Sequence, residues 1–485
     1  MTPPIRFGTD GWRGVVGDDF TYETLRYAAQ GVAEYLNNRA TSPARSTAAT
    51  PVAVVGYDCR FASEFFAEDV ARVLAGNGVR TLLFDRPAPT QVASWTVVEC
   101  RAGGAAVVTA SHNPYQFNGL KYKPETGSAA PPEVIAELER GISARAAQGP
   151  AAVHRAEPDD PLIQRHDPRP AYYAQVGRMV DLEALRRAGL RIVHECMHGS
   201  GAGYVRELIA GGASTVTELH PERNPFFGGV NPEPIPPNIA AAQRLMGDGG
   251  QDICICSDGD ADRVGIIDET GRFINQLQVY ALLMRYLVEV RGWRGPVVKS
   301  VNMTAMADQL GQHYGVPVHE VPVGFKNIAP KMMETEAVLG GEESGGYAIR
   351  GHLPERDGIL AGIFIADMMV KADQPLSEVL HQLEAVVGPH AYARHDIHMQ
   401  RETYETDRRR VIETLAANAP RVIAGVPVER VRDDDGYKFY LKDGSWVLLR
   451  TSGTEPLIRV YSEAASDEEV QARLATLEEV VGIHA

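Results

Sequence analysis

The chain has 485 residues, of which 44% are hydrophobic and 23% charged, an ordinary balance for a globular protein. Its 48 basic and 63 acidic side chains give a formal net charge of −15, and no run rich in Lys or Arg is present. This balance speaks against a nucleic-acid-binding protein, which usually presents a basic face. The apolar segment 359–366 falls short of the roughly 20 residues that a membrane span needs.

The N-terminus and the cysteines bear on the cellular compartment in which the chain is expected. Its N-terminus shows no apolar signal region, and its five cysteines follow no regular framework. Such cysteines fit reduced thiols, so we expect a cytoplasmic protein. Cys254 and Cys256 alternate in an apolar stretch, which favours a core strand over a metal or redox role.

Strand-length apolar runs alternate with helix-like stretches, a pattern typical of α/β proteins with largely parallel strands. One order recurs three times: strand, helix, strand, helix, strand, then a polar loop containing glycine. The clearest segments are 51–57, 63–76, 79–84 and 105–108; then 190–194, 203–210, 214–219 and 252–256; then 296–299, 304–314, 316–321 and 337–340. We therefore expect three similar α/β domains with mixed, mostly parallel sheets, each presenting a loop where open sheets bind ligands.

The remainder of the chain follows a different pattern. From about residue 389, short strands precede a terminal helix near 467–480, which predicts a smaller α+β domain. The segment 40–50, rich in Ala, Ser, Thr and Pro, is expected as an exposed loop. At roughly 100–200 residues per domain, the length suits about three or four domains. The predicted boundaries are 1–165, 166–274, 275–388 and 389–485.

The first polar loop reads TASHNP at 109–114. Ser111, at the end of a strand, could act as a nucleophile, although a plain polar loop is an alternative. Adjacent side chains point in different directions, so His112 does not imply a Ser–His pair of the hydrolase kind. Lys121 lies ten residues further on and could return to this loop as an acid/base or a phosphate contact.

The second polar loop, DGDADR, carries Asp258, Asp260 and Asp262 at alternate positions. In a tight turn the three carboxylates can face one centre, and hard oxygen donors suit Mg²⁺ or Ca²⁺. A calcium loop between helices is the rival interpretation, but its sixth position needs glycine and is Arg263 here. Because a strand-like run precedes the loop, we favour a Mg²⁺ site at a strand end. An acidic surface turn without metal is a further alternative.

Two more loops carry polar side chains beside glycines. The sequence GEESGG at 341–346 could contact sugar hydroxyls through Glu342 and Ser344, although a simple turn is an alternative. The sequence RTSGTEP at 450–456 offers a guanidinium, hydroxyls and backbone N–H groups to a phosphate, although it lacks the P-loop pattern. The glycine cluster at 199–203 has Tyr204 where a dinucleotide fingerprint needs glycine.

These loops, in this order, resemble the α-D-phosphohexomutase family, and the resemblance runs from FGTDGWRG at 7–14 to Arg459. It implies three similar α/β domains and a smaller fourth around a central cleft. It further implies phosphorylation of Ser111 and a Mg²⁺ site formed by Ser111, Asp258, Asp260 and Asp262. The other catalytic residues that it implies are His112, Lys121, Arg13 and Arg263. The implied substrate-binding residues are Lys299, Gly324, Lys326, Glu342, Ser344, Arg450, Ser452, Gly453, Thr454 and Arg459.

Three positions bear on the subclass within this family. Lys326 looks like the lysine of phosphoglucomutases, where dual-specificity phosphomannomutase/phosphoglucomutases more often have histidine. Gly346 likewise stands where those dual-specificity enzymes commonly have histidine. Glu343 departs from the glutamine typical of bacterial phosphoglucosamine mutases. A phosphoglucomutase is favoured, and a dual-specificity enzyme is the alternative.

The expected reaction interconverts glucose 1-phosphate and glucose 6-phosphate through phosphoserine, with Mg²⁺ as cofactor and glucose 1,6-bisphosphate as activator and intermediate. The expected partners are small hexose phosphates, with no nucleic acid or membrane, and the chain is expected as a monomer or homodimer. The fourth domain is expected to move as a lid. Two other classes stay open: a sugar-phosphate phosphatase and a non-catalytic sugar-phosphate-binding protein.

Overall fold

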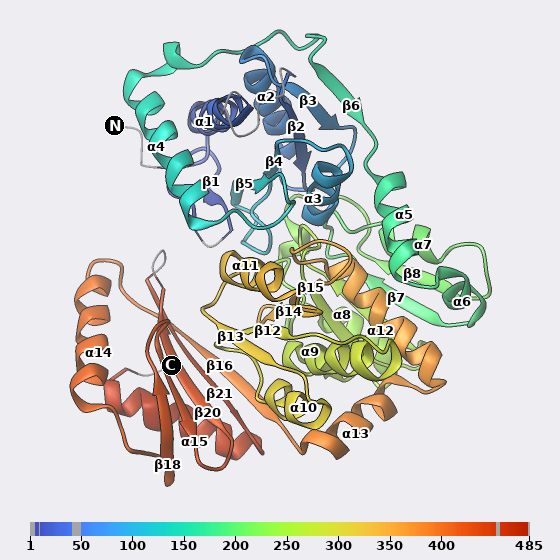
Figure 1. The fold of residues 1–485 in the computed structure, drawn as a ribbon, viewed down its shortest axis with the longest axis vertical. Helices are drawn as coiled ribbons and strands as arrows, with labels where there is room; N and C mark the ends of the chain where they lie inside the picture. The colour runs from blue at the N-terminus through green and yellow to red at the C-terminus, as the bar shows by residue number, and fades with distance from the viewer. Residues whose placement is uncertain (1–4, 9, 41–49, 453–455, 484–485) are drawn as a thin grey trace.

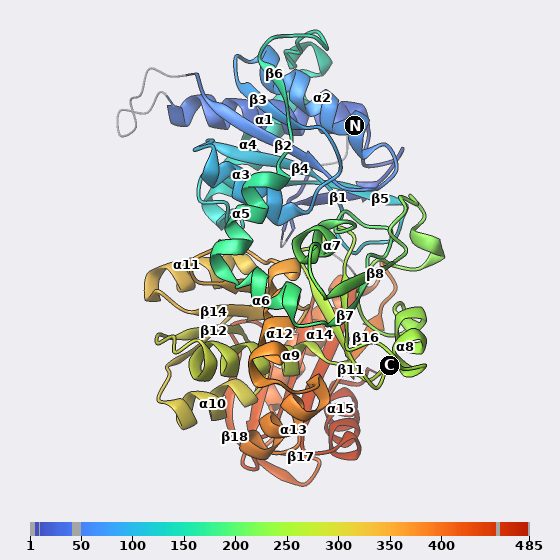
Figure 2. The ribbon, with the colours of Figure 1, turned by 90° about the vertical axis from the view of Figure 1, so that its right-hand side faces the viewer.

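A computed structural model describes residues 5–8, 10–40, 50–452 and 456–483. The chain forms four units, each built around one sheet (Figure 1). Figures 1 and 2 show the first unit at the top, the second and third below it, and the fourth packed beside the third. Most of the loop expected at 40–50 lies outside the described residues, as do Gly453 and Thr454 of the fourth polar loop.

The first unit contains a six-stranded sheet in the order β1-β5-β4-β2-β3-β6. Strands β2, β3 and β4 are parallel, because the helices α2 and α3 cross over between them, and β5 returns antiparallel to β4. Its elements are β1 (Trp12–Val15), α1 (Tyr22–Ala40), β2 (Val52–Tyr57), α2 (Ser63–Gly76), β3 (Arg80–Phe84), α3 (Thr90–Glu99), β4 (Gly104–Val108), β5 (Phe117–Pro124), α4 (Pro132–Gln148), η1 (Pro150–Ala152) and β6 (Ile163–His166).

The second and third units repeat the core of this topology, with sheet orders β11-β10-β9-β7-β8 and β13-β12-β14-β15. In each, three parallel strands end in an antiparallel return strand, as β4 and β5 do in the first unit. The second unit comprises α5 (Arg169–Met179), α6 (Leu182–Arg187), β7 (Arg191–Glu195), α7 (Tyr204–Ile209), β8 (Thr215–Leu219), η2 (Phe227–Gly229), α8 (Ala240–Gly247), β9 (Ile253–Ser257), β10 (Val264–Asp268) and β11 (Phe273–Ile274). The third comprises α9 (Gln276–Arg285), η3 (Tyr286–Val290), β12 (Val297–Ser300), α10 (Met306–Tyr314), β13 (Val318–Val321), α11 (Phe325–Thr335), β14 (Leu339–Glu342), β15 (Gly346–Ile349), α12 (Gly358–Ala372) and α13 (Leu376–Val387).

The fourth unit is an antiparallel sheet, β16-β21-β20-β19-β18-β17, with two helices. Helix α15 begins after the N-cap Ser466, whose side chain accepts from Glu469 N, and ends at Gly482 in a left-handed conformation. The elements are β16 (Ala391–His398), α14 (Tyr404–Asn418), β17 (Val422–Ile423), β18 (Val426–Arg432), β19 (Tyr437–Leu441), β20 (Trp446–Thr451), β21 (Leu457–Ala464) and α15 (Asp467–Val481).

Burial follows the sequence pattern closely. The central strands are short apolar runs rich in β-branched residues, such as VAVVGY in β2 and ICICS in β9. Cys254 and Cys256 in β9 are fully buried, as the sequence predicted for a core strand. Helix α12, which contains the apolar segment 359–366, is apolar all round because it is enclosed by the second and third units. Across the residues that the structure describes, no helix has the length and apolarity that crossing a membrane requires.

The cores explain how the units are joined. One continuous apolar core runs through the first three units, whereas the fourth unit has a core of its own. A small separate cluster joins the third unit to the fourth, with Val301 against Trp446, Leu448 and Tyr461. The fold confirms the three similar α/β domains with mixed sheets and the smaller C-terminal α+β domain that the repeat pattern predicted.

Candidate active site

The aspartate loop is a tight turn between the antiparallel strands β9 and β10. Asp258, Asp260 and Asp262 are fully buried, and one oxygen from each lies within 4.8 Å of the others. The turn is possible because Ala261 adopts a left-handed conformation, with φ of 57°. A loop between two strands excludes the calcium loop of the helix–loop–helix kind and agrees with the predicted strand-end position.

Ser111 lies directly against this loop. It follows β4 in a left-handed conformation, with φ of 53°, and its Oγ donates to Asp258 Oδ2 at 2.9 Å. The two loops touch at Gly259, where a Cβ atom would stand 2.5 Å from Ser111 O, so only glycine permits this approach. The hydroxyl also lies 3.3 Å from His112 Nδ1, a contact that adjacency in the sequence did not predict. Burial, and then Arg263 and Arg13 nearby, lower the pKa of His112 well below its usual value.

The serine loop is held from behind by Arg60, which sequence reasoning missed. This guanidinium is fully buried and donates to four carbonyl oxygens of the loop, those of Ser111, Asn113, Pro114 and Phe117, at 2.5–2.9 Å. Its Nε lies 3.3 Å from Asp58, a buried carboxylate. A guanidinium presents five N–H donors in a rigid fork, so one side chain can fix the path of a whole loop.

Lys121 on β5 is the central cation of the site. Its Nζ lies 2.8 Å from carboxylate oxygens of Asp10, Asp260 and Asp262. Burial alone would lower the pKa of Lys121, but these three carboxylates outweigh burial and raise it. The lysine is therefore protonated in this arrangement, so it can donate a proton and supply positive charge to the site.

The three aspartates offer donors for a divalent cation. Burial, and then Asp260 and Asp262, raise the pKa of Asp258 well above its usual value. Oδ1 of Asp260 and Oδ1 of Asp262 are buried and accept no hydrogen bond from the described residues. Unpaired, converging carboxylate oxygens beside a serine hydroxyl fit Mg²⁺, which takes hard oxygen donors.

Arg356 connects three loops and was also missed. It is 3% exposed and lies 2.9 Å from Asp262 Oδ2 and 3.0 Å from Glu342 Oε1, and its NH2 also pairs with Asp10. Glu355 lies 3.4 Å from its Nε. The aspartate loop, the sugar loop and the N-terminal segment thus share one guanidinium. Because its partners are up to 346 residues away along the chain, no local pattern announces this role.

The remaining predicted catalytic arginines lie close to the same centre. Arg13 on β1 donates to Asn113 Oδ1 at 2.6 Å, in the serine loop. Arg263 is buried at the end of the aspartate loop, with its Nε 3.9 Å from Asp262 and its NH1 3.6 Å from Glu233. Burial, followed by Arg263, lowers the pKa of Arg13. Arg13 and Arg263 thus contact the loops that carry Ser111 and the aspartates, and guanidinium groups are frequent partners of phosphate.

The sugar loop between β14 and β15 reaches this centre through Glu342. Ser344 Oγ donates to Glu342 Oε1 at 3.0 Å. The next residue, Glu343, turns to the fourth unit, where it accepts from Tyr392 at 2.7 Å and from Arg394 at 3.2 Å. The structure thus ties the loop at 341–346 to the aspartate loop on one side and to the fourth unit on the other.

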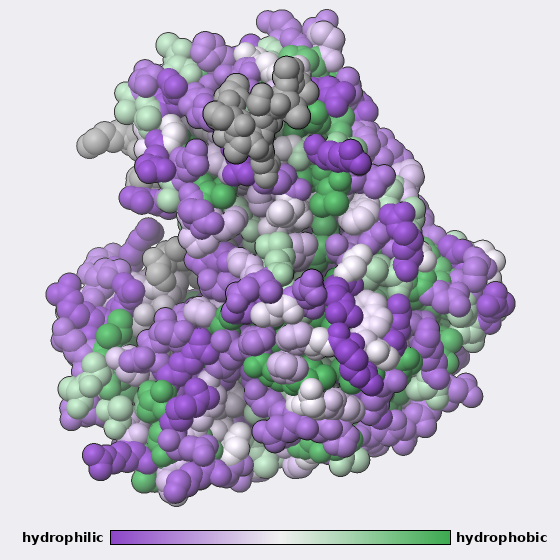
Figure 3. Space-filling model, viewed as in Figure 1, coloured by the Kyte–Doolittle hydropathy of each residue, from purple (hydrophilic) through white to green (hydrophobic). Residues whose placement is uncertain are grey.

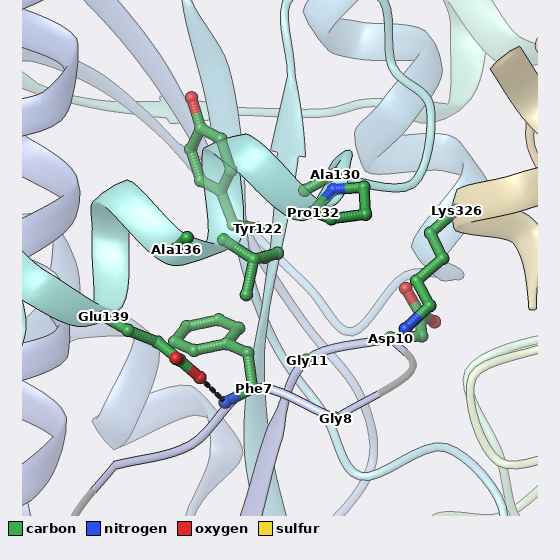
Figure 4. Close-up of a pocket in the computed structure, with 11 residues that line it drawn as sticks. Phe7, Gly8, Asp10, Gly11, Tyr122, Ala130, Pro132, Ala136, Glu139 and Lys326 are labelled. Carbon is green, nitrogen blue, oxygen red and sulfur yellow. Dashed lines mark hydrogen bonds between the residues drawn. The ribbon is translucent and has the colours of Figure 1, made fainter.

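Lys326 lies at a cavity of about 170 Å³ between the first and third units. Figure 4 shows its side chain extending from α11 toward Asp10, with Phe7, Gly8 and Gly11 of the N-terminal segment along the cavity. Gly324, at the start of α11, has φ of 112°, a conformation that favours glycine.

Other predicted substrate-binding residues lie in or beside the fourth unit. Arg450 pairs with Asp435 at 2.9 Å and Arg459 with Asp396 at 3.4 Å, so the structure does not bring them to the aspartates. Ser452 follows β20 at the start of the fourth polar loop. Figure 3 shows the molecular surface notched at its left edge, between the first unit above and the fourth below. Lys299 on β12 is buried within the third unit, where it donates to Thr304 O at 2.9 Å and pairs with Asp308 and Glu320.

Comparison with known proteins agrees with this geometry. Profiles of the phosphoglucomutase/phosphomannomutase family match in succession: α/β/α domain I at residues 4–148, domain II at 170–271, domain III at 275–386 and the C-terminal domain at 407–480. A phosphoglucomutase/phosphomannomutase of Thermococcus kodakarensis is 28% identical over 96% of this chain and 96% of its own. A phosphoglucosamine mutase of Frankia casuarinae is 30% identical over 98% of this chain and 97% of its own.

Solved structures give the same result. The crystal structure of a candidate phosphomannomutase from Thermus thermophilus is 34% identical, covers 99% of this chain and 100% of that one, and has a TM-score of 0.85. Aspergillus fumigatus N-acetylphosphoglucosamine mutase, solved with GlcNAc-6P and magnesium, is 14% identical over 99% of this chain and 96% of that one. At this low identity, its TM-score of 0.59 shows a likeness in fold alone. The full-length matches and the four domain profiles show that this chain belongs to the α-D-phosphohexomutase family, the intramolecular phosphotransferases of the phosphoglucomutase/phosphomannomutase type.

Proposed function

We propose that this chain interconverts glucose 1-phosphate and glucose 6-phosphate through phosphoserine at Ser111 and a glucose 1,6-bisphosphate intermediate. The observation that carries the proposal is the 2.9 Å contact of Ser111 Oγ with Asp258, inside a ring of carboxylates and cations. Phosphoryl transfer depends mainly on alignment and on neutralising negative charge as it spreads over the transferred group. The cations around Ser111 are suited to that task.

Each half of the reaction would exchange one P–O bond for another. The phosphate on Ser111 passes to the free sugar hydroxyl, and the other phosphate of the bisphosphate later returns to the serine oxygen. Lys121, protonated because three carboxylates raise its pKa, supplies a proton donor and positive charge at the serine oxygen. Arg13 and Arg263 would hold the phosphoryl oxygens, while neutral His112 offers a hydrogen-bond partner to Ser111.

The metal-binding residues in this proposal are Asp258, Asp260 and Asp262, with the oxygen of Ser111. Mg²⁺ bound there would neutralise charge on the transferring phosphoryl group. The proposal is supported by the unpaired oxygens of Asp260 and Asp262. Magnesium and glucose 1,6-bisphosphate are named in structures of the A. fumigatus N-acetylphosphoglucosamine mutase, and for this chain both are proposals.

The sugar would be held by the third unit and its non-reacting phosphate by the fourth. Glu342 and Ser344 offer an acceptor and a donor to sugar hydroxyls, and Lys326 and Gly324 line the approach. Lys299, Arg450, Ser452, Gly453, Thr454 and Arg459 complete the proposed set. The domain limits 1–165, 166–274, 275–388 and 389–485 belong to the same proposal. A dual-specificity enzyme acting on mannose phosphates is the second candidate, favoured by the T. kodakarensis relative.

A coupled assay tests the proposal on purified protein primed with Mg²⁺ and glucose 1,6-bisphosphate. Conversion of glucose 1-phosphate to glucose 6-phosphate without release of inorganic phosphate is expected. Phosphate release would identify a phosphatase, and absence of both reactions a binding protein. Turnover of glucose, mannose and glucosamine 1-phosphates should favour glucose, and a preference for another sugar would overturn the substrate assignment.

The nucleophile has its own test. Ser111→Ala should abolish turnover and leave no phosphorylated serine in intact-mass spectra after incubation with the bisphosphate. Ser94→Ala is the matched control, because the buried Ser94 hydroxyl has no hydrogen-bond partner among the described residues. Turnover retained by Ser111→Ala would refute the assignment.

A further inference from the structure

A second group of side chains with metal-ligand chemistry lies on the second sheet, apart from the aspartates. Parallel strands β7 and β8 pair in a register that sets His194 opposite Glu218. Cys196 follows His194 by two residues, and its N–H donates to Leu219 O at 3.0 Å, which continues the same pairing. Because side chains two residues apart share one face, the sheet brings an imidazole, a thiol and a carboxylate together. Strands β7 and β8 lie on the right-hand side of Figure 1, near α7.

The distances within this group are those of a coordination shell. Cys196 Sγ lies 3.4 Å from His194 Nδ1 and 3.8 Å from Glu218 Oε1, and Nδ1 lies 3.7 Å from Oε1. Zinc bonds are about 2.0–2.2 Å to N or O and 2.3 Å to S, which makes the edges of a tetrahedron roughly 3.3–3.6 Å long. Each donor pair is therefore within about 0.4 Å of a tetrahedral edge.

Hydrogen bonding alone accounts poorly for the same arrangement. A distance of 3.7 Å between His194 Nδ1 and Glu218 Oε1 is too long for a hydrogen bond. The thiol of Cys196 has a single proton and can satisfy only one of its two neighbours. His194 and Cys196 are fully buried, and the Glu218 side chain is 4% exposed.

The outer contacts orient these donors as metal sites do. His194 Nε2 lies 2.9 Å from Ser257 Oγ, which leaves Nδ1 facing the group. Glu218 Oε1 accepts from Gly203 N at 2.5 Å, and Oε2 lies 2.6 Å from Arg206 NH1. Metal-binding histidines almost always engage their second nitrogen in this way, and ligating carboxylates are held by further hydrogen bonds.

We infer that His194 Nδ1, Cys196 Sγ and Glu218 Oε1 form a second, structural metal site for Zn²⁺. A thiolate, an imidazole and a carboxylate suit Zn²⁺, whereas Mg²⁺ takes oxygen donors only. Binding converts the Cys196 thiol to a thiolate and releases one proton to solvent, and the fourth position is left to water. Ser257 directly precedes Asp258, so the bound ion braces the strand end from which the aspartate loop begins.

The test uses the full-length protein, stripped of metal with a chelator and then loaded with Zn²⁺ or Co²⁺ in the presence of excess Mg²⁺. One Zn²⁺ per chain should survive dialysis, as measured by elemental analysis, and Zn²⁺ should raise the melting temperature. Co²⁺ at the same site should give a thiolate charge-transfer band. The aspartate loop has no sulfur donor, so this band cannot come from Co²⁺ bound there.

Matched variants separate this site from adventitious binding. Cys196→Ser and Glu218→Gln should each lose the retained Zn²⁺, and Cys196→Ser should lose the Co²⁺ band. Cys256→Ser, a buried thiol on the adjacent strand β9, should keep both. Ser257→Ala should weaken Zn²⁺ binding by roughly 10- to 100-fold, as outer-contact changes do.

Absence of retained Zn²⁺ and of the band at stoichiometric Co²⁺ would overturn the inference. So would Zn²⁺ retained equally by Cys196→Ser and Glu218→Gln, or a band that survives in Cys196→Ser. None of these readouts depends on sugar turnover. The inference therefore stands or falls separately from the proposed mutase activity.

Discussion

Arg356→Gln removes the guanidinium that three loops share. Of its four carboxylate partners, Asp10 and Asp262 keep Lys121, and Glu355 keeps Lys123 at 2.7 Å. Glu342 is different, because within the described part of the chain its other side-chain hydrogen bond comes from the neutral hydroxyl of Ser344. The substitution therefore leaves about one buried carboxylate without a compensating charge.

The expected magnitude follows from that count. Removing one partner of a buried ion pair costs about 3–5 kcal/mol. At about 2.1 cal/mol/K of unfolding entropy per residue, the roughly 380 residues of the first three units have an unfolding entropy of about 0.8 kcal/mol/K, so their calorimetric transition should fall by roughly 4–6 °C. The affected transition is that of the first three units, because they share one apolar core.

Scanning calorimetry of the unsubstituted protein and three variants tests this expectation. Arg272→Gln is the matched control, because Arg272 is 48% exposed and pairs with Glu384 at 3.5 Å, so less than about 1 kcal/mol is expected. Arg356→Gln combined with Glu342→Gln should recover part of the loss, because the uncompensated charge is then gone. A shift no larger than that of Arg272→Gln, or no recovery in the double variant, would refute the reasoning.

Three further outcomes are expected. Thr90→Val removes the 2.6 Å hydrogen bond from Thr90 Oγ1 to Asp260, so the Mg²⁺ concentration needed to activate turnover should rise roughly 10- to 100-fold. Thr96→Val, on the same helix, is the control, and an equal Mg²⁺ dependence of the two variants would contradict this. A thiol reagent at pH 8 should label one cysteine of the native protein, the half-buried Cys100, and all five cysteines after unfolding. The reason is that burial raises the pKa of the Cys59 thiol to about 12 and that the other three thiols are also buried. Labelling of native Cys100→Ser would contradict this expectation. Burial lowers the pKa of Lys438 from 10.5 to about 8, so between these pH values the unfolded chain binds more protons than the folded chain. The free energy of unfolding, compared with that of Lys438→Met, should therefore rise with pH across this window by on the order of 3 kcal/mol. A difference that does not change with pH in urea unfolding would disprove this.

Several features of this protein could be predicted from local sequence. The three repeated units were predictable because strand and helix periodicity is written within each segment, and strands such as 252–256 agree with β9 to within one residue. The aspartate loop was predictable because three carboxylates at alternate positions are chemically distinctive wherever they fold. The placement of Ser111 at a strand end follows from the same local reasoning.

The partners of these residues could not be predicted in this way. Asp10 and Arg356 stand 346 residues apart, and Thr90 and Asp260 are separated by 170. An arginine or threonine in a loop carries no mark of the charge that it will meet. His194, Cys196 and Glu218 likewise form a group only through the register of β7 and β8.

The sequence by itself therefore determined the order of the elements, the repeated architecture and the identity of the reactive loops, because hydrophobic periodicity and turn chemistry act over a few residues. Only the tertiary structure decided which charges neutralise one another around Ser111. Coulombic and hydrogen-bond energies depend on distances of a few ångströms in space, and these are fixed by the packing of whole units.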